Sequence, residues 1–280
     1  MKVLVTGAKG QLGTDLVEVL QAKSFEVIAL DLDEVDLTDR EAVLRTMAGL
    51  SFDAVIHCAA YTAVDKAEDD RDACYAINVT ATQTLAEVCA QRDAKLLYIS
   101  TDYVFDGSGE RPWAVDSPRE PLSVYGKTKS EGEDVVRELV RKHFIVRISW
   151  VFGRHGAINF VKTMTRLGKE RESIGVVNDQ VGSPTFTEDL SVLLAEMVAT
   201  DKYGTYHATN EGTCSWYEFA KEIMRVQGLS CEVKPLRSSE YPTKAQRPKN
   251  SRLDKTCLDN AGFARLPRWE DALRRFGGLI

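Results

Sequence analysis

The chain has 280 residues, of which 44% are hydrophobic and 28% are charged, and it carries a formal net charge of −6. These proportions are typical of a globular protein that folds as one large domain or as two modest ones. The acidic balance argues against nucleic-acid and anionic-membrane partners, because both need clustered basic charge.

Cysteine usage and the apolar runs predict a cytoplasmic protein. The apolar runs fall short of the roughly 20 residues of a membrane span, and the start "MKVLVTGAKG" lacks the apolar core of a signal peptide. Six scattered cysteines form no C-x-x-C pair. This spacing favours buried thiols over a disulfide framework or a zinc site.

Strand-like apolar runs alternate with helical patterns through the first half of the chain. Strands are predicted at 2–7, 26–30, 52–60, 95–100 and 143–153, with helices at 11–22, 75–92 and around 125–133. Short apolar strands between helices indicate a parallel sheet covered on both faces. We therefore predict an α/β, doubly wound Rossmann fold over residues 1–153.

The pattern loosens over residues 154–280, which we predict to form mostly a smaller substrate-binding lobe. Helices are expected at 158–169, 187–199, 215–228 and near 269–276, with a short strand at 204–210. A strand near 174–185 is expected to return to the first domain. Because ligands of open α/β sheets bind beyond the carboxyl ends of the strands, the lobe would cover that crevice.

A glycine-rich turn follows the first predicted strand. "TGAKGQLG" places Gly7, Gly10 and Gly13 between a strand and a helix, where glycines let backbone N–H groups approach a pyrophosphate. The spacing is G-x-x-G-x-x-G, and the alternative is an ordinary strand-to-helix turn. We interpret it as a dinucleotide site.

The choice between NADH and NADPH stays open at this stage. Asp31 ends the second strand, where a carboxylate accepts hydrogen bonds from the adenosine ribose and repels a 2′-phosphate. Lys9 in the glycine turn offers that phosphate a positive charge. The alternative for Asp31 is a simple acid at a strand end.

Two further patterns carry hydroxyl and phenol chemistry. Ser100, Thr101 and Asp102 stand at the end of a strand, where a hydroxyl can bond a substrate carbonyl or merely cap a turn. Tyr125 and Lys129 stand four apart, on one face of a predicted helix. Each pattern alone is common.

In this order, the motifs resemble the extended, nucleotide-sugar branch of the short-chain dehydrogenase/reductase superfamily. Longer stretches are similar to the dTDP-4-dehydrorhamnose reductase family, which makes dTDP-L-rhamnose. They are "GQLG", "HCAAYTAVDKAE", "STDYVFDG", "YGKTKSEGE", "RISWVFG", "NFVKTM", "NDQVGSPT" and "RPKNSRLD". The resemblance runs to about residue 255.

The resemblance implies hydride transfer from NADH or NADPH to the C4 ketone of a dTDP-keto-deoxyhexose. Tyr125 would donate the proton, Lys129 would lower the pKa of the phenol and hold the nicotinamide ribose, and Thr101 would share the substrate oxygen. Implied cofactor contacts are Gly7, Gly10, Gln11, Leu12, Gly13, Asp31, Asp36, Leu37, Ala59, Ala60, Tyr61, Asn78, Ser100, Tyr125 and Lys129. Implied substrate contacts are Thr101, Asp102, Val104, Phe105, Tyr125, Trp150, Asn178, Gln180 and Arg247. Trp150 has an alternative as a core aromatic, and Arg247 as a surface charge.

Some members of the family dimerise around magnesium, so we expect either a monomer or a homodimer. Asp15 and Glu188 align with two of the magnesium ligands, and the alternative is that both are surface carboxylates. The rival functions are a nucleotide-sugar epimerase or dehydratase of the same superfamily, and a non-catalytic regulatory subunit that binds a dinucleotide.

Overall fold

A computed structural model of the chain describes residues 1–278 and contains a six-stranded parallel sheet. The order of its strands is β10-β5-β4-β3-β1-β2. These strands are β1 (Lys2–Thr6), β2 (Glu26–Leu30), β3 (Ala54–His57), β4 (Lys95–Thr101), β5 (His143–Ile148) and β10 (Gly204–His207). The order reverses between β1 and β3, which is where such sheets bind ligands.

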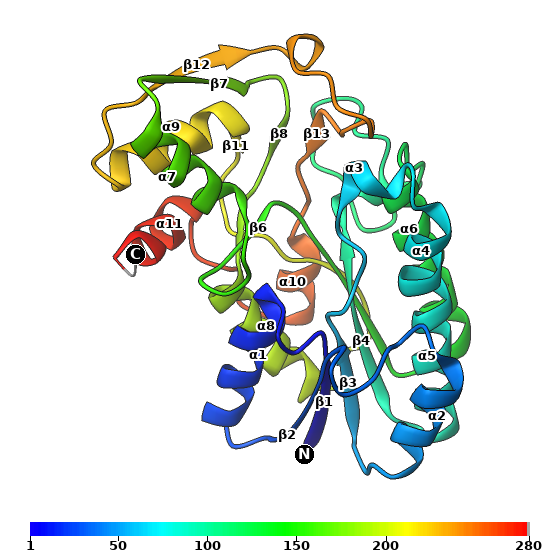
Figure 1. Cartoon of the computed structure of the whole chain (residues 1–280). Coiled ribbons are helices and arrows are strands. Elements are labelled where there is room, and N and C mark those ends of the chain that lie inside the picture. Colours follow the sequence, from blue (N-terminus) through cyan, green and yellow to red (C-terminus); the bar gives the residue numbers. More distant parts are fainter. Residues whose placement is uncertain (279–280) are drawn as a thin grey trace.

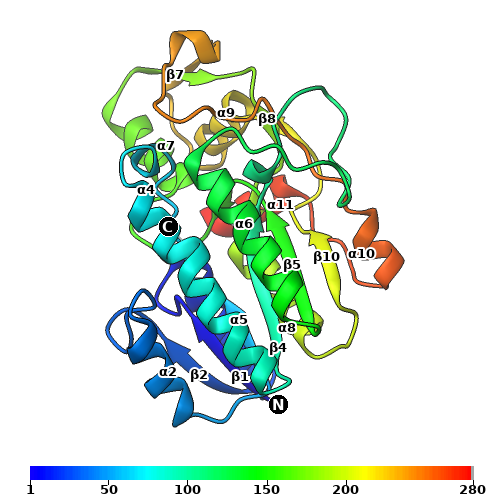
Figure 2. The ribbon, with the colours of Figure 1, turned by 90° about the vertical axis from the view of Figure 1, so that its right-hand side faces the viewer.

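Helices cover both faces of this sheet, as the sequence predicts. On one face lie α1 (Gln11–Ala22), α8 (Thr187–Val198) and α10 (Thr256–Ala261); on the other lie α2 (Arg40–Ala48), α5 (Thr82–Gln91) and α6 (Val124–Leu139) (Figures 1 and 2). Side chains alternate along a strand, so Val3 and Val5 of β1 enter one core and Leu4 enters the other. The doubly wound fold is therefore confirmed.

The predicted helix at 75–92 begins earlier and contains a wider turn. It runs from α4 (Arg71–Tyr75) through the π-helical turn η1 (Ala76–Ala81) into α5. Short helices α3 (Val64–Ala67) and η2 (Asp102–Val104) follow β3 and β4. Such π turns are frequent at functional sites.

The C-terminal lobe is built from short pieces around an aromatic core. Its helices are α7 (Phe160–Glu170), α9 (Trp216–Val226), η3 (Ser238–Glu240) and α11 (Trp269–Gly277). Its strands are β6 (Val151–Phe152), β7 (Ser173–Val177), β8 (Val181–Gly182), β9 (Thr185–Phe186), β11 (Cys214–Ser215), β12 (Glu232–Leu236) and β13 (Asn250–Ser251). Phe152, Phe186, Phe219 and Phe276 are fully or almost fully buried among them.

Two strand predictions need correction. The segment near 174–185 does not return to the large sheet: β7 pairs with β12, and β10 is the strand that joins the edge at β5. Exposed and buried residues alternate at the start of β7, which suits a sheet covered on one face rather than two. The predicted strand at 143–153 is divided into β5 and β6, because Trp150 turns the chain with a positive φ of 50°.

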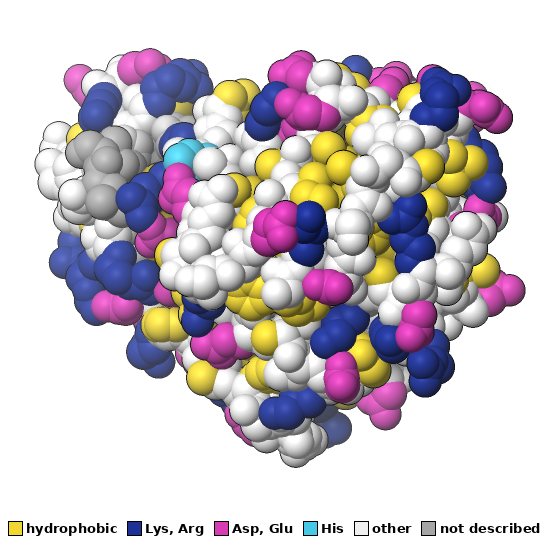
Figure 3. Space-filling model, turned by 90° about the horizontal axis from the view of Figure 1, so that it is seen from below, with side chains coloured by type: hydrophobic (Ala, Val, Ile, Leu, Met, Phe, Trp, Pro, Cys, Tyr) yellow, Lys and Arg dark blue, Asp and Glu magenta, His cyan; other side chains and the backbone are white. Residues whose placement is uncertain are grey.

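Three elements from beyond residue 153 thus belong to the large sheet or cover it. They are α8, which packs along α1, β10 at the edge of the sheet, and α10, which packs on β10. Lys23 after α1 and Glu196 of α8 form an ion pair of 3.8 Å. On the face drawn in Figure 3, positively and negatively charged side chains are interspersed over most of the area.

A segment between β12 and β13 crosses from the lobe to α3 (Figure 1). The backbone N–H of Ala245 and the guanidinium of Arg247 both reach the Asp65 carboxylate of α3. Within residues 1–278 no helix combines the length and apolar character that crossing a bilayer requires.

Candidate active site

One cavity of about 770 Å³ lies beyond the carboxyl ends of the central strands, between the sheet and the lobe. It reaches from the glycine turn after β1 to the start of α6 and to the loop between β5 and β6. Of the residues predicted for the site, its lining contains Gly7, Gly10, Gln11, Leu12, Asp31, Asp36, Leu37, Ala59, Ala60, Ser100, Thr101, Asp102, Tyr125, Lys129 and Trp150.

The glycine turn brings backbone unusually close to backbone. Gly7 has a φ of +65°, and a Cβ atom there would lie 2.7 Å from the backbone nitrogen of Ala59. A Cβ on Gly13 would overlap the carbonyl oxygen of Gly7, so this glycine lets α1 approach the end of β1. Gly13 itself does not line the cavity. Gly10 caps α1 without a side-chain hydrogen bond. The first N–H groups of α1 thus face an open position that suits an anion.

At the end of β2, the acidic loop holds Lys9. The backbone N–H of Lys9 donates to the Asp31 carboxylate at 2.7 Å. The Lys9 ammonium lies 2.8 Å from Asp33 and 2.9 Å from Glu34. Hydrogen bonds to these two carboxylates raise the pKa of Lys9. The positive charge that the sequence offers to a 2′-phosphate is therefore already paired.

Thr101, Tyr125 and Lys129 all line the cavity. Tyr125 lies in the first turn of α6, where the Ser123 hydroxyl caps the helix by accepting from the N–H of Gly126 at 3.1 Å. Removal of water from the phenol raises the pKa of Tyr125, and the Thr101 hydroxyl opposes that rise. Burial lowers the pKa of Lys129 to about 7, against the opposite effect of Glu133.

Ser100 and Asp102 face different partners on either side of Thr101. The Ser100 hydroxyl donates to Glu133 at 2.6 Å, and Thr101 donates to Asp102 at 3.0 Å. Asp102 is 2% exposed, and burial raises its pKa to about 6. Ser100 therefore contributes to the wall while its hydroxyl anchors α6.

Two predicted substrate contacts lie in a small core instead. Val104 and Phe105 are fully buried with Leu253, and Phe105 stacks on Trp113 at 4.8 Å between ring centroids. The turn η2 directs them away from the cavity. Tyr103, which was not predicted, lines the cavity between them and Thr101.

Asn78 and Tyr61 are also outside the lining. The Asn78 amide accepts from the N–H of Tyr61 at 2.9 Å and donates to the Thr128 hydroxyl at 3.0 Å. Asn78 is 1% exposed within the π-helical turn. Its place in the structure is to fasten the loop after β3 to α6.

The predicted sugar and phosphate contacts are dispersed over the lobe. Trp150 lines the cavity and stacks on Trp216 at 3.7 Å. Asn178 accepts from the Ser215 hydroxyl at 2.7 Å, and Gln180 donates to Ser238 at 3.0 Å, both outside the lining.

Arg247 is outside the lining of the cavity but contacts one of the lining residues. Its guanidinium pairs with Asp65 at 2.5 Å and donates to the hydroxyl of the lining residue Tyr103 at 3.2 Å. Both contacts hold the guanidinium beside Tyr103.

Several lining residues were missed by sequence reasoning, among them Thr38, Cys58, Thr62, Ser149 and Asn159. Asn159 caps α7 by accepting from the N–H of Lys162, and its amide donates to Gln11 at 2.7 Å. An asparagine before a helix signals a cap. Its contact with the glycine turn depends on chain folding over 148 positions.

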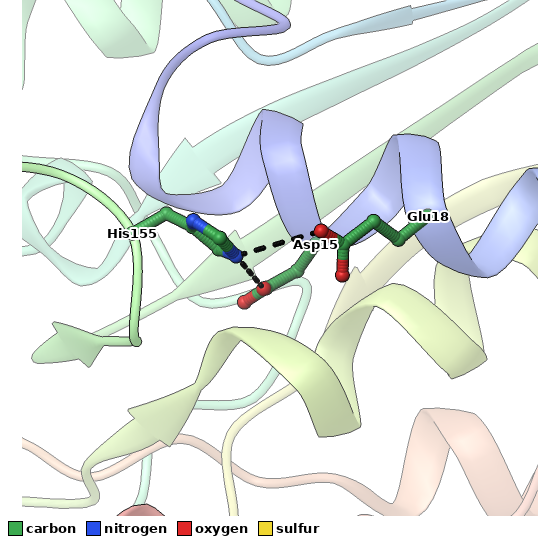
Figure 4. Close-up of side chains that lie close together, drawn as sticks. All are labelled: Asp15, Glu18 and His155. Carbon is green, nitrogen blue, oxygen red and sulfur yellow. Dashed lines mark ion pairs between the residues drawn. The ribbon is translucent and has the colours of Figure 1, made fainter. Parts of the chain in front are cut away.

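The residues proposed for magnesium do not form a joint site. Figure 4 shows His155 directed toward Asp15 and Glu18 of α1, at 3.3 and 3.7 Å. These three side chains are close enough to share an ion, but Glu188 pairs with Arg154 instead. Asp15 also accepts from Thr187, and burial raises its pKa. Magnesium prefers oxygen ligands, so an imidazole and a nearby guanidinium give that expectation no support.

Known proteins share both the sequence and this architecture. Residues 1–277 match the family described as the RmlD substrate binding domain. The dTDP-4-dehydrorhamnose reductase of Aggregatibacter actinomycetemcomitans is 40% identical, over 98% of this chain and 97% of the relative. The spore coat polysaccharide biosynthesis protein SpsK of Bacillus subtilis is also 40% identical, over 98% of this chain and 96% of the relative. The crystal structure of dTDP-4-dehydrorhamnose reductase from Bacillus anthracis in complex with NADP has a TM-score of 0.96, 43% identity, and coverage of 100% and 99%.

Proposed function

We propose that this chain, which belongs to the family of dTDP-4-dehydrorhamnose reductases, reduces the C4 ketone of dTDP-4-dehydro-L-rhamnose to dTDP-L-rhamnose with NADH or NADPH. The observation that carries the proposal is the shared cavity: Thr101, Tyr125 and Lys129 line the same space as the glycine turn and Asp31. A dinucleotide that rests on the turn would bring its reactive end to the phenol.

The residues around the glycine turn fit a dinucleotide. The Ala59 backbone leaves no room for a side chain at Gly7, so the turn can pass close to the loop after β3, and the uncapped start of α1 supplies backbone donors for a pyrophosphate. Asp31 would accept from the adenosine ribose. A bound NADH or NADPH supplies the hydride.

Tyr125 would protonate the alkoxide as it forms, and the Thr101 hydroxyl, which donates to Asp102 in the structure, would turn to donate to the same oxygen. A raised pKa keeps the phenol protonated at neutral pH, as a proton donor must be, but it also makes the phenol a weaker acid. Each unit by which Lys129 and the cofactor lower that pKa in the complex corresponds to about 1.4 kcal/mol of electrostatic stabilisation. General acid catalysis of this kind contributes about 10²–10⁴-fold.

Arg247 and Trp150 are the proposed substrate contacts at the lobe end. A guanidinium pairs with two phosphate oxygens at once, so Arg247 would exchange Asp65 for the diphosphate of the substrate. Trp150, already stacked on Trp216, would support the sugar. Asn178 and Gln180 would reach the substrate only if the lobe moves.

The test is oxidation of NADH and of NADPH, each measured in the presence of dTDP-4-dehydro-L-rhamnose. Wild type should oxidise at least one of the two cofactors, and Tyr125→Phe should lose about 10²–10⁴-fold in kcat/KM with that cofactor while it binds the cofactor as before. Absence of oxidation of both cofactors by wild type would refute the reductase. Conversion of the sugar without net oxidation would indicate an epimerase or dehydratase, and dinucleotide binding without turnover a regulatory subunit.

A further inference from the structure

Lys129 rests on an aromatic ring in the structure. Its side chain is 2% exposed, and its ammonium nitrogen lies 3.9 Å from the centroid of the Tyr98 ring. Tyr98 belongs to β4, three residues before Thr101, and is fully buried. A cation over the face of a phenol ring is attracted by the ring quadrupole, more strongly where water is excluded.

The neighbours of Tyr98 hold the ring in this position. A Cβ atom on Gly132 would overlap the Tyr98 hydroxyl, so this glycine lets α6 lie close over the ring. Gly132 follows Lys129 by three residues, and positions three apart share a helix face. The centroid of the His57 ring also lies 5.8 Å from that of Tyr98. The helix therefore seats Lys129 and encloses Tyr98 with the same face.

The other groups near Lys129 stabilise its charge weakly. Glu133 is the nearby carboxylate, but Arg147 already binds both of its oxygens, each at 2.8 Å. The remaining titratable groups around Lys129 and its seat are Tyr125, Tyr98, His57, Cys58 and Cys74. Burial lowers the pKa of His57 to about 3 and raises that of Cys58 to about 12, so both are neutral near pH 7.

We propose that the ring of Tyr98 is a positioning element of the active site, whose π face holds the Lys129 ammonium charged and in place in the wall that it shares with Tyr125. The catalytic consequence rests on the proposed function. If Lys129 must be charged to assist proton donation by Tyr125, then a ring that attracts the ammonium less strongly should lower the pKa of Lys129. The alkaline loss of activity should then begin at a lower pH. The seating of Lys129 itself can be measured without substrate.

Graded fluorination of the ring tests the proposal at nearly constant shape. Phenylalanine and its mono-, di- and trifluoro derivatives would replace Tyr98, because each fluorine withdraws charge from the π face. Lysine labelled with ¹³C at Cε would report the pKa of Lys129 by NMR in the cofactor-free protein, with the signal assigned by Lys129→Gln. Tyr98→Phe should titrate like wild type, and the pKa should fall in steps with fluorine number, by about 0.5–1 unit across the series.

The alkaline limb of kcat/KM for the keto sugar should move down by the same amount. The same series at Phe144, a buried ring of the opposite core, should change neither quantity. A Lys129 pKa that is independent of fluorine number would overturn the positioning role, whatever the activity. If the pKa of Lys129 falls stepwise with fluorine number but the protein oxidises neither NADH nor NADPH with the sugar, the positioning role of Tyr98 would be supported and the proposed reaction refuted.

Discussion

Around the glycine turn, the cavity wall is made by parallel strands of four to seven residues that continue into a buried sheet. At the lobe end, the elements near the cavity are two-residue strands and loops, brought together from β6, β8 and β13. The first region places its side chains through local backbone geometry. The second depends on long-range contacts such as Arg247 with Asp65. We expect the nucleotide end to behave as a rigid frame and the lobe end as an adjustable one.

The largest effect on the free energy of unfolding is expected for Glu133, which joins α6 to β5 through Arg147 at the nucleotide end. Both Glu133 oxygens bind Arg147, and both side chains are buried. Glu133→Gln would leave the Arg147 charge unpaired, which costs about 3–5 kcal/mol when a buried pair is broken. Urea unfolding would measure this loss.

The matched control is Glu170→Gln in the lobe, where Glu170 forms an exposed pair with Arg166. This change should cost less than about 1 kcal/mol. Equal losses in the two variants would contradict the distinction between the regions.

The same carboxylate gives the frame a pH dependence. Burial alone would raise the pKa of Glu133, but the hydrogen bonds and charge of Arg147, with Ser100, lower it to about 2. The unfolded value is about 4.3, so this stabilisation is complete above that pH and is lost as the pH falls toward 2. In urea titrations between pH 5 and 2.5, wild type should lose more stability than Glu133→Gln, and parallel curves would exclude this source.

At the lobe end, Arg247→Ala should weaken substrate binding with little change in kcat. Hydrogen bonds to charged groups contribute about 1.5–3 kcal/mol, so KM for the nucleotide sugar should rise about 10–100-fold. Interactions made equally in the ground and transition states appear in KM alone. Lys244→Ala is the control. Lys244 lies in the same segment as Arg247 and also pairs with an aspartate, Asp69, but its side chain is about half exposed. An unchanged KM in Arg247→Ala would remove Arg247 from the substrate site.

The difference between the two regions also explains what the sequence could predict. Gly7, Asp31, Thr101 and Tyr125 each stand at a junction of strand and turn or helix, which apolar patterns reveal directly. Their common cavity follows from the parallel sheet, because the carboxyl ends of its strands meet at one edge.

Val104, Phe105 and Asn178 could not be placed in this way. The turn η2 and the pairing of Asn178 with Ser215 are set by chain segments far apart in the sequence. The return of β10, instead of the segment near 174–185, has the same origin. Which strand completes the sheet depends on how the lobe packs, and a strand pattern does not encode that packing.

The smallest expected effect concerns the choice of cofactor at the nucleotide end. Asp31 and Asp36 line the cavity where the adenosine ribose is expected, and Asp33 and Glu34 in the same loop already pair with Lys9. We therefore expect wild type to favour NADH over NADPH, and Asp31→Ala to raise the ratio of kcat/KM for NADPH to that for NADH by about 5–10-fold. Carboxylate–phosphate repulsion across a hydrated gap is about 1 kcal/mol per charge pair.

The Lys9→Ala variant separates the attraction of the 2′-phosphate by Lys9 from its repulsion by Asp31. If the Asp33 and Glu34 carboxylates neutralise Lys9, its removal should lower kcat/KM for NADPH less than 2-fold. A larger loss would mean that Lys9 leaves its carboxylates for the 2′-phosphate, and the nucleotide end would then be as adjustable as the lobe. Steady-state rates with both cofactors at two salt concentrations would decide, since an exposed charge contribution shrinks as salt screens it.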